Sequence, residues 1–69
     1  MGYTLLVTNV DGARVDGMWG MKPTAEELRY CIGGMYCDEQ EQDIIDDLLD
    51  QGYVSIGDSA CTTYELSQG

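Results

Sequence analysis

Two stretches near the start of the chain have the pattern of hydrophobic and polar residues that is typical of β-strands. Residues 3–10 are rich in β-branched and apolar side chains. Farther on, Ala13, Val15, Gly17 and Trp19 alternate with Arg14, Asp16 and Met18. Asp11-Gly12 lies between the two runs and is a residue pair typical of a type I′ turn. The pattern predicts a β-hairpin.

After Pro23 the apolar spacing changes to that of a short amphipathic helix. Thr24-Ala25-Glu26-Glu27 is a capping box, in which Thr24 accepts hydrogen bonds from backbone N–H groups and Glu27 reaches back to Thr24. One apolar face follows at the spacing i, i+3, i+4 and consists of Leu28, Cys31 and Ile32. Gly33-Gly34 ends this helix.

A second helix is predicted over residues 38–50, DEQEQDIIDDLLD. Asp38 and Glu41 repeat the capping pattern, and Gly52 follows the last turn as a stop signal. The helix has one narrow apolar face, formed by Ile44, Ile45, Leu48 and Leu49.

The last quarter of the chain predicts a second hairpin. Residues 53–56 and 61–66 have strand character, and Gly57-Asp58-Ser59-Ala60 joins them. The predicted order is ββααββ in a single domain over residues 1–69. We therefore expect an α+β fold, with a small antiparallel sheet from two hairpins and two short helices on one face.

Two segments resemble known families. Residues 23–67 resemble the end of a winged-helix domain, with a capped helix at Thr24, a helix ending in LLDQGYV and a hairpin closing with TYELS, so a winged-helix-like fold is the alternative. The stretch GDSACTTYEL resembles the phosphopantetheine site of acyl carrier proteins, which implies Ser59 as the attachment point. Only ten residues follow Ser59, and the stretch is β-branched and aromatic in character, whereas that family has two further helices there.

Charge excludes several classes of partner. Thirteen acidic residues oppose Arg14, Lys22 and Arg29, which gives a formal net charge of −10, and residues 30–69 contain no base. Such a chain repels nucleic acid and anionic lipid and is attracted to basic surfaces. We expect no direct nucleic-acid or membrane binding. The natural partner is a positively charged protein, unless the acids serve solubility alone.

On a helical wheel the acids of the second helix lie opposite its apolar face and form a stripe, which consists of Glu39, Asp43, Asp46, Asp47 and Asp50. Five like-charge pairs at i, i+3 or i, i+4 each destabilise the helix by about 0.2–0.5 kcal/mol. This energetic cost favours a binding role over a solvated face. Tyr36, beside the acids in the turn between the helices, is the best aromatic candidate for a partner contact.

A short, strongly acidic, cytosolic domain without a catalytic motif resembles the phage-encoded inhibitors that include DNA mimics and many anti-CRISPR proteins. The resemblance implies a non-enzymatic inhibitor or decoy that binds a basic nucleic-acid-binding protein, such as a CRISPR effector subunit, through its acidic helix. The alternative is a small acidic scaffold or adaptor protein that binds through its apolar and aromatic surface.

Catalytic, metal and cofactor chemistry lack their usual residues. The chain has no histidine, so Ser-His and Cys-His nucleophiles are impossible, and we expect no enzymatic activity. Cys31, Cys37 and Cys61 lack the paired spacing of a zinc site and are interpreted as small core-filling residues. No EF-hand, P-loop or dinucleotide motif is present, so neither metal nor cofactor is expected. Without a signal peptide or membrane span, we expect a cytoplasmic protein with reduced thiols.

Overall fold

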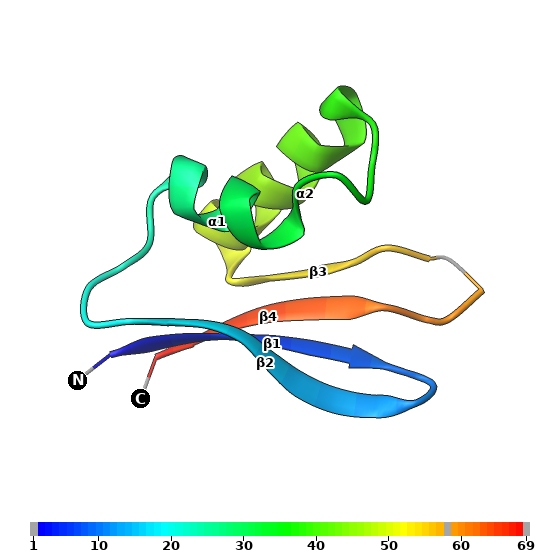
Figure 1. Cartoon of the computed structure of the whole chain (residues 1–69), viewed down its shortest axis with the longest axis horizontal. Coiled ribbons are helices and arrows are strands. Elements are labelled where there is room, and N and C mark those ends of the chain that lie inside the picture. The colour runs from blue at the N-terminus through cyan, green and yellow to red at the C-terminus, as the bar shows by residue number, and fades with distance from the viewer. Residues whose placement is uncertain (1, 58, 69) are drawn as a thin grey trace.

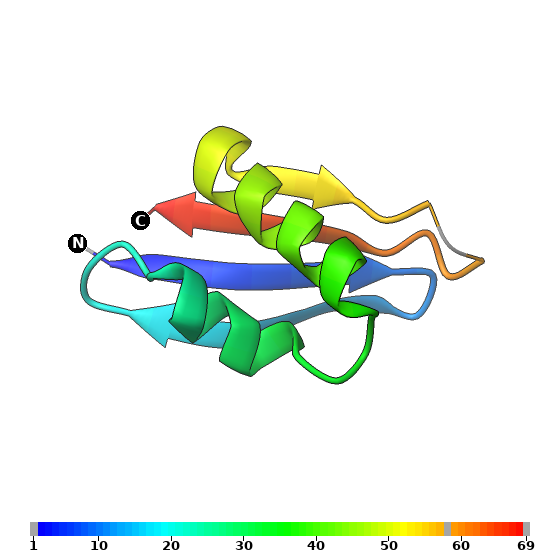
Figure 2. The same cartoon turned by 90° about the horizontal axis from the view of Figure 1, so that it is seen from above.

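The protein consists of a four-stranded antiparallel sheet with two helices across one of its faces (Figures 1 and 2). A computed structural model describes residues 2–57 and 59–68. The elements, in chain order, are β1 (Tyr3–Asn9), β2 (Gly12–Trp19), α1 (Ala25–Ile32), α2 (Asp38–Gln51), β3 (Tyr53–Ser55) and β4 (Thr63–Gln68). The predicted α+β class and ββααββ order are confirmed. Asp58, in the predicted turn of the second hairpin, lies outside the described residues.

The strand order is β2-β1-β4-β3, so the first and last strands of the chain are neighbours at the centre of the sheet. Each hairpin adds one edge strand. This arrangement differs from the winged-helix alternative, because β3 and β4 extend a sheet begun by β1 and β2 and do not form a separate wing. The acyl-carrier resemblance is wrong at Ser59, since strand β4 follows that residue where the family has helices.

The core lies between the sheet and the helices. The two central strands, β1 and β4, and both helices contribute to it. Its buried side chains are those of Leu5, Val7, Leu28, Ile32, Ile44, Ile45, Leu48 and Tyr64. Residues that face each other across a strand pair share a face of the sheet, and Leu5 pairs with Leu66 while Val7 pairs with Tyr64. The helix-facing side of the two central strands is therefore apolar.

The first hairpin turn differs from its prediction by one residue. Asn9 pairs with Gly12, so Val10 and Asp11 are the central residues of the turn. Cys61 is the one non-glycine residue with positive φ in the described part of the chain, which excludes a type I′ turn at Val10-Asp11. A β-branched valine disfavours positive φ, and Gly12 instead adopts it after the turn, at φ 127°. The Asn9 side chain accepts a hydrogen bond from the Asp11 N–H at 2.9 Å.

A β-bulge interrupts the alternation predicted for β2. Leu5 pairs with Gly17, but its neighbour Leu6 pairs with Val15, so Asp16 is an extra residue. Gly17 and Trp19 consequently face the helices, whereas Val15 and Ala13 lie on the opposite face. The sequence pattern placed these residues in one unbroken alternation, and that interpretation is wrong beyond the bulge.

Gly17 provides room for the Trp19 indole. A Cβ added at Gly17 would lie 2.5 Å from the Trp19 ring and 3.1 Å from the Cys31 sulfur. The ring thus covers the bare backbone of Gly17, and α1 approaches the same point through Cys31.

Gly17→Ala should destabilise the fold by about 1–3 kcal/mol, because the new methyl group overpacks the contact between Trp19 and Cys31. Gly20→Ala is the matched control: no atom lies within 4 Å of a Cβ built there, and its φ is not positive. Urea denaturation of both variants checks the prediction. Equal midpoints for the two variants would contradict it.

Candidate functional site

Helix α2 presents the candidate site, and both of its ends are well defined. Gly52 ends the helix in the left-handed conformation, with φ 85°, and its N–H donates to the Leu48 carbonyl at 3.0 Å. The Lys22 ammonium donates to the Leu49 carbonyl at 3.2 Å, so a cation lies at the negative end of the helix dipole. The predicted stop at Gly52 is confirmed.

The N-terminal cap of α2 differs from the prediction. Cys37 is the N-cap residue and makes no side-chain capping bond, so Asp38 is already within the helix. Glu41 does not reach back to cap the helix, because it forms an ion pair with Arg29 of α1 at 3.1 Å. Asp38, Glu39 and Glu41 all lie in the first turn, where the helix dipole favours anions.

One face of α2 packs on the sheet, which Figure 2 shows as a helix lying obliquely across the strands. Ile44, Ile45 and Leu48 are buried and Leu49 is partly buried, so the predicted apolar face is confirmed. Glu41 is buried on the same side, because it lies one turn before Ile44 and Ile45. The spacing of Glu41 from Ile44 and Ile45 in the sequence indicates that its side chain lies on the buried side of the helix, where a carboxylate needs a partner such as Arg29. The capping role predicted for Glu41 missed this signal.

The acids of the predicted stripe lie on the outer side of α2. Glu39, Asp43, Asp46 and Asp50 are exposed, and Asp47 is partly buried. Asp46 accepts a hydrogen bond from the Gln42 amide at 2.9 Å, which orients one carboxylate along the helix. We call Glu39, Asp43, Asp46, Asp47 and Asp50 the acidic stripe.

The three basic side chains make their polar contacts elsewhere. Arg14 pairs with Asp16 at 3.1 Å, and Arg29 pairs with Glu41 and donates to the Gln42 side chain. Lys22 donates to a backbone carbonyl. Within residues 2–57 and 59–68, no ion pair involves a carboxylate of the acidic stripe. The five carboxylates therefore have no direct counter-charge in this part of the chain.

Tyr36 is partly committed to the core. Its hydroxyl lies 3.1 Å from the Tyr64 hydroxyl, and the two rings meet edge to face with centroids 6.5 Å apart. Burial, and then the hydrogen bond with Tyr36, raise the pKa of the Tyr64 phenol far above its ordinary value. Tyr36 is half-buried, so only part of it is available to a partner beside the acidic stripe.

The cysteines are placed differently from the expectation of three core residues. Cys31 is half-buried against the core, and burial followed by the charges of Asp16 and Glu27 raises the pKa of its thiol. Cys37 and Cys61 are exposed, so the core-filling interpretation is wrong for both. Among the described residues, no three histidine, cysteine or acidic side chains converge in a way that could hold a metal ion.

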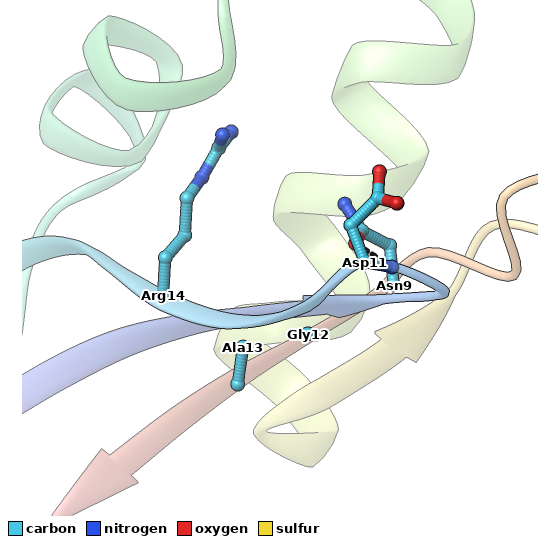
Figure 3. A pocket seen from close by; sticks show the side chains of 5 residues that line it. All are labelled: Asn9, Asp11, Gly12, Ala13 and Arg14. Atoms are coloured by element: carbon cyan, nitrogen blue, oxygen red, sulfur yellow. Dashed lines mark hydrogen bonds between the residues drawn. The ribbon is translucent and has the colours of Figure 1, made fainter.

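A shallow hollow lies at the tip of the first hairpin, lined by Asn9, Asp11, Gly12, Ala13 and Arg14 (Figure 3). The Arg14 side chain extends toward the helix layer, whereas Ala13 points to the other side of the sheet. The hollow combines the hairpin turn with a single base, Arg14. It has no row of like charges comparable to the acidic stripe.

Comparisons with protein-family models, curated proteins and solved structures found no match to this chain. No helix in the described part of the chain has both the length and the apolar character needed to cross a membrane. Function is therefore inferred from the residues and their geometry.

Stability should fall in alkaline solution as the pH rises above about 10, the ordinary pKa of tyrosine. The unfolded Tyr64 phenol ionises there, while the folded one keeps its proton to higher pH, so deprotonation favours unfolding. Urea denaturation between about pH 8 and about pH 11 measures this loss of stability. Tyr64→Phe should show a shallower decline; an equally steep decline would mean that other groups cause it.

Replacing Asp43, Asp46, Asp47 and Asp50 with Asn should stabilise the fold by about 1–2 kcal/mol at low salt. The variant removes all five like-charge pairs and the anions near the helix C-terminus, and it retains Glu39 where the dipole favours it. Asparagine and aspartate have similar helix propensities. Denaturation midpoints of variant and parent should converge at about 1 M salt, where screening removes the repulsion. Equal midpoints at low salt would exclude a repulsive stripe.

Proposed function

We propose that this protein is a non-enzymatic inhibitor or decoy that places the acidic stripe of α2 against the basic nucleic-acid channel of a partner protein. The partner is a basic nucleic-acid-binding protein of the cytoplasm, and a CRISPR effector subunit is the most concrete example. In this role the acidic stripe competes with DNA or RNA by its charge and outline, which is an anti-CRISPR-like activity.

The observation that supports the proposal most strongly is the uncompensated charge on α2. The three bases contact Asp16, Glu41 and the Leu49 carbonyl, and none of them forms an ion pair with a carboxylate of the acidic stripe in the described part of the chain. Four of the five stripe carboxylates are also exposed. A solvated row of anions attracts a basic surface over a distance of about 8–10 Å at physiological salt. The acidic stripe is therefore suited to steering and docking a cationic partner.

The spacing of the acids is compatible with nucleic-acid mimicry. From Glu39 to Asp50 the helix rises roughly 16 Å at about 1.5 Å per residue. Five carboxylates are thus strung at about one per 3–4 Å, and one strand of B-DNA carries a phosphate per about 3.4 Å of axis. A groove lined with lysine and arginine at phosphate spacing could accept either.

The folding energetics also support a binding role. The like-charge pairs oppose helix formation in a chain of 69 residues, a size at which the core supplies only about 3–5 kcal/mol. Interspersed lysines would keep such a domain soluble without repulsion. Retaining the unrelieved repulsion is expected where the surface serves binding.

The second candidate is a scaffold or adaptor that binds through apolar and aromatic surface. The observation in its favour is the exposure of several large apolar side chains, including Val15, Met18 and Tyr53 on the sheet and Tyr30 on α1. An adaptor of this kind should bind with little dependence on salt, whereas binding through the acidic stripe should weaken steeply as ionic strength rises.

Two variants with the same net charge test the position of the binding surface. Asp43→Asn with Asp50→Asn removes two exposed acids of the stripe, and Asp11→Asn with Glu26→Gln removes two exposed acids elsewhere. Each changes the net charge from −10 to −8. The stripe variant should lose at least about tenfold in affinity for the basic partner, while the control should lose less than about threefold.

The partner is first recovered by a pull-down from nuclease-treated lysate at low and high salt, and affinity is then measured with the purified protein. DNA should compete with the parent protein for this partner. Equal losses for the two variants would show that net charge alone matters and would refute a docking site on α2. Salt-insensitive recovery of a partner with no basic surface would favour the adaptor.

A further inference from the structure

The face of the sheet opposite the helices is uncovered, because α1 and α2 both lie on the same side (Figure 1). Strand pairing places eleven residues on this face, in rows of three, four and four residues that run across the sheet. We call it the open face: Met18, Thr4, Ser67; Val15, Leu6, Glu65, Tyr53; Ala13, Thr8, Thr63, Ser55.

The middle row of the open face is mainly apolar. Val15 pairs with Leu6, Leu6 with Glu65, and Glu65 with Tyr53, so the four side chains run across all four strands. Val15 is 53% exposed and Tyr53 is 55% exposed. Met18, in the next row, is 74% exposed. These side chains leave apolar surface in water on a domain that has little core to spare.

Charge is almost absent from the open face. The chain carries thirteen acids, but Glu65 is the one charged residue among the eleven. A basic partner would therefore find little attraction here, and its electrostatic target is the opposite side of the molecule. For a second copy with a net charge of −10, the open face is the direction of approach with the least repulsion.

The hydroxyl groups of the open face are self-complementary. Five of its residues are serine or threonine, namely Thr4, Thr8, Ser55, Thr63 and Ser67. A hydroxyl both donates and accepts hydrogen bonds, so an identical face can satisfy each of them. An interface of this composition needs no complementary charges on a different protein.

Edge pairing is a less suitable route to association. Strand β2 is an edge of the sheet, but the bulge at Asp16 interrupts its ladder and twists it. The other edge strand, β3, has three residues. Neither edge offers a long, regular template, so the open face is the better surface for a second copy.

We propose that two copies of this chain associate through their open faces as a symmetric dimer. The eleven residues, at about 4.8 Å between strands and about 6.8 Å between successive side chains on one face, give a footprint of roughly 360 Å² per copy. Because side chains make the surface uneven, the area that the two copies bury together is larger than twice this footprint. It is on the order of 1,000 Å², at the low end for specific interfaces. It is thus a weak dimer with four layers, and its helices and acidic stripes lie on the two outer sides.

Glu65 limits the strength of this dimer. Its carboxylate lies between Leu6 and Tyr53 in the middle row, and no ion pair to it occurs in the part of the chain that the structure describes. Covering the open face removes water from an anion that has no cation nearby, which opposes association. Glu65→Gln keeps the size and removes this penalty.

Sedimentation equilibrium of the full chain, from about 5 to about 500 µM, tests the proposal in the range expected for a small interface. The mass should rise with concentration from 7.6 kDa toward twice that value. Added salt should strengthen association, because it screens repulsion between the copies. This dependence is opposite in sign to that of the proposed binding to a basic partner, so either proposal can fail without the other.

Two methionines provide a matched pair of variants. Met18→Glu puts a second carboxylate on the open face, whereas Met21→Glu makes the same change at an 81% exposed residue beyond the end of β2. Met18→Glu should weaken dimerisation at least about tenfold, because it buries another anion without a cation, and Met21→Glu should change it less than about twofold. Glu65→Gln should strengthen it by about three- to tenfold.

Three results would overturn the proposal: a mass of one chain at the highest concentration, equal effects of the two methionine-to-glutamate variants, or weaker association of Glu65→Gln. A dimer that persists unchanged in Met18→Glu would instead use a strand edge or the helix side.

Discussion

The pairing of β1 with β4 is the interaction on which the rest of this structure depends. No other strand pairing in the described sheet joins the two hairpins, and its partners are as distant in the chain as Tyr3 and Gln68. Bringing them together closes a long loop, which carries an entropic cost. Because the same register aligns Leu5 with Leu66 and Val7 with Tyr64, closure creates the apolar surface that both helices cover.

This closure also makes the molecule two-sided. Once α1 and α2 lie on one face of a four-stranded sheet, the acids opposite the apolar face of α2 point away from the sheet, and no helix or strand of the described residues covers the other sheet face. The acidic stripe and the open face therefore lie on opposite sides of the molecule. The buried side chains of Ile44, Ile45 and Leu48 set the orientation of α2 on the sheet. This orientation directs the acidic stripe away from the open face.

The sequence was informative wherever a regular period ran without interruption. The element order, the capping box of α1, the apolar face of α2 and the stop at Gly52 follow from spacing and from local capping chemistry, and all are present. The capping box is complete, with Glu27 N–H donating to Thr24 at 3.2 Å and Thr24 N–H donating to Glu27 at 3.0 Å.

The errors occurred where one residue changes the register or where a partner is distant in sequence. The extra residue at Asp16 reverses the faces of Val15 and Ala13. The glycine that follows it, Gly17, is the one sequence feature of β2 that is typical of a bulge, and it does not fix the position of the extra residue. Glu41 fits a local capping pattern, but Arg29 of α1 offers a stronger, charge-assisted partner across the helix pair. For the acidic stripe, the positions were predictable from the helical wheel, whereas the absence of a compensating base required the fold.

The locations of the three bases bear directly on the meaning of the acid excess. Arg29 joins α1 to α2 through Glu41 and Gln42, Lys22 holds the loop after β2 to the end of α2, and Arg14 pairs beside the bulge. Each base thus supports a specific feature of the fold. Two acids, Asp16 and Glu41, are enough to pair with the arginines. The remaining acids of α2 contribute no ion pair to the fold, and their mutual repulsion opposes the helix that carries them. Folding therefore does not account for the acidic stripe, which is the physical reason to seek its explanation in what the protein binds.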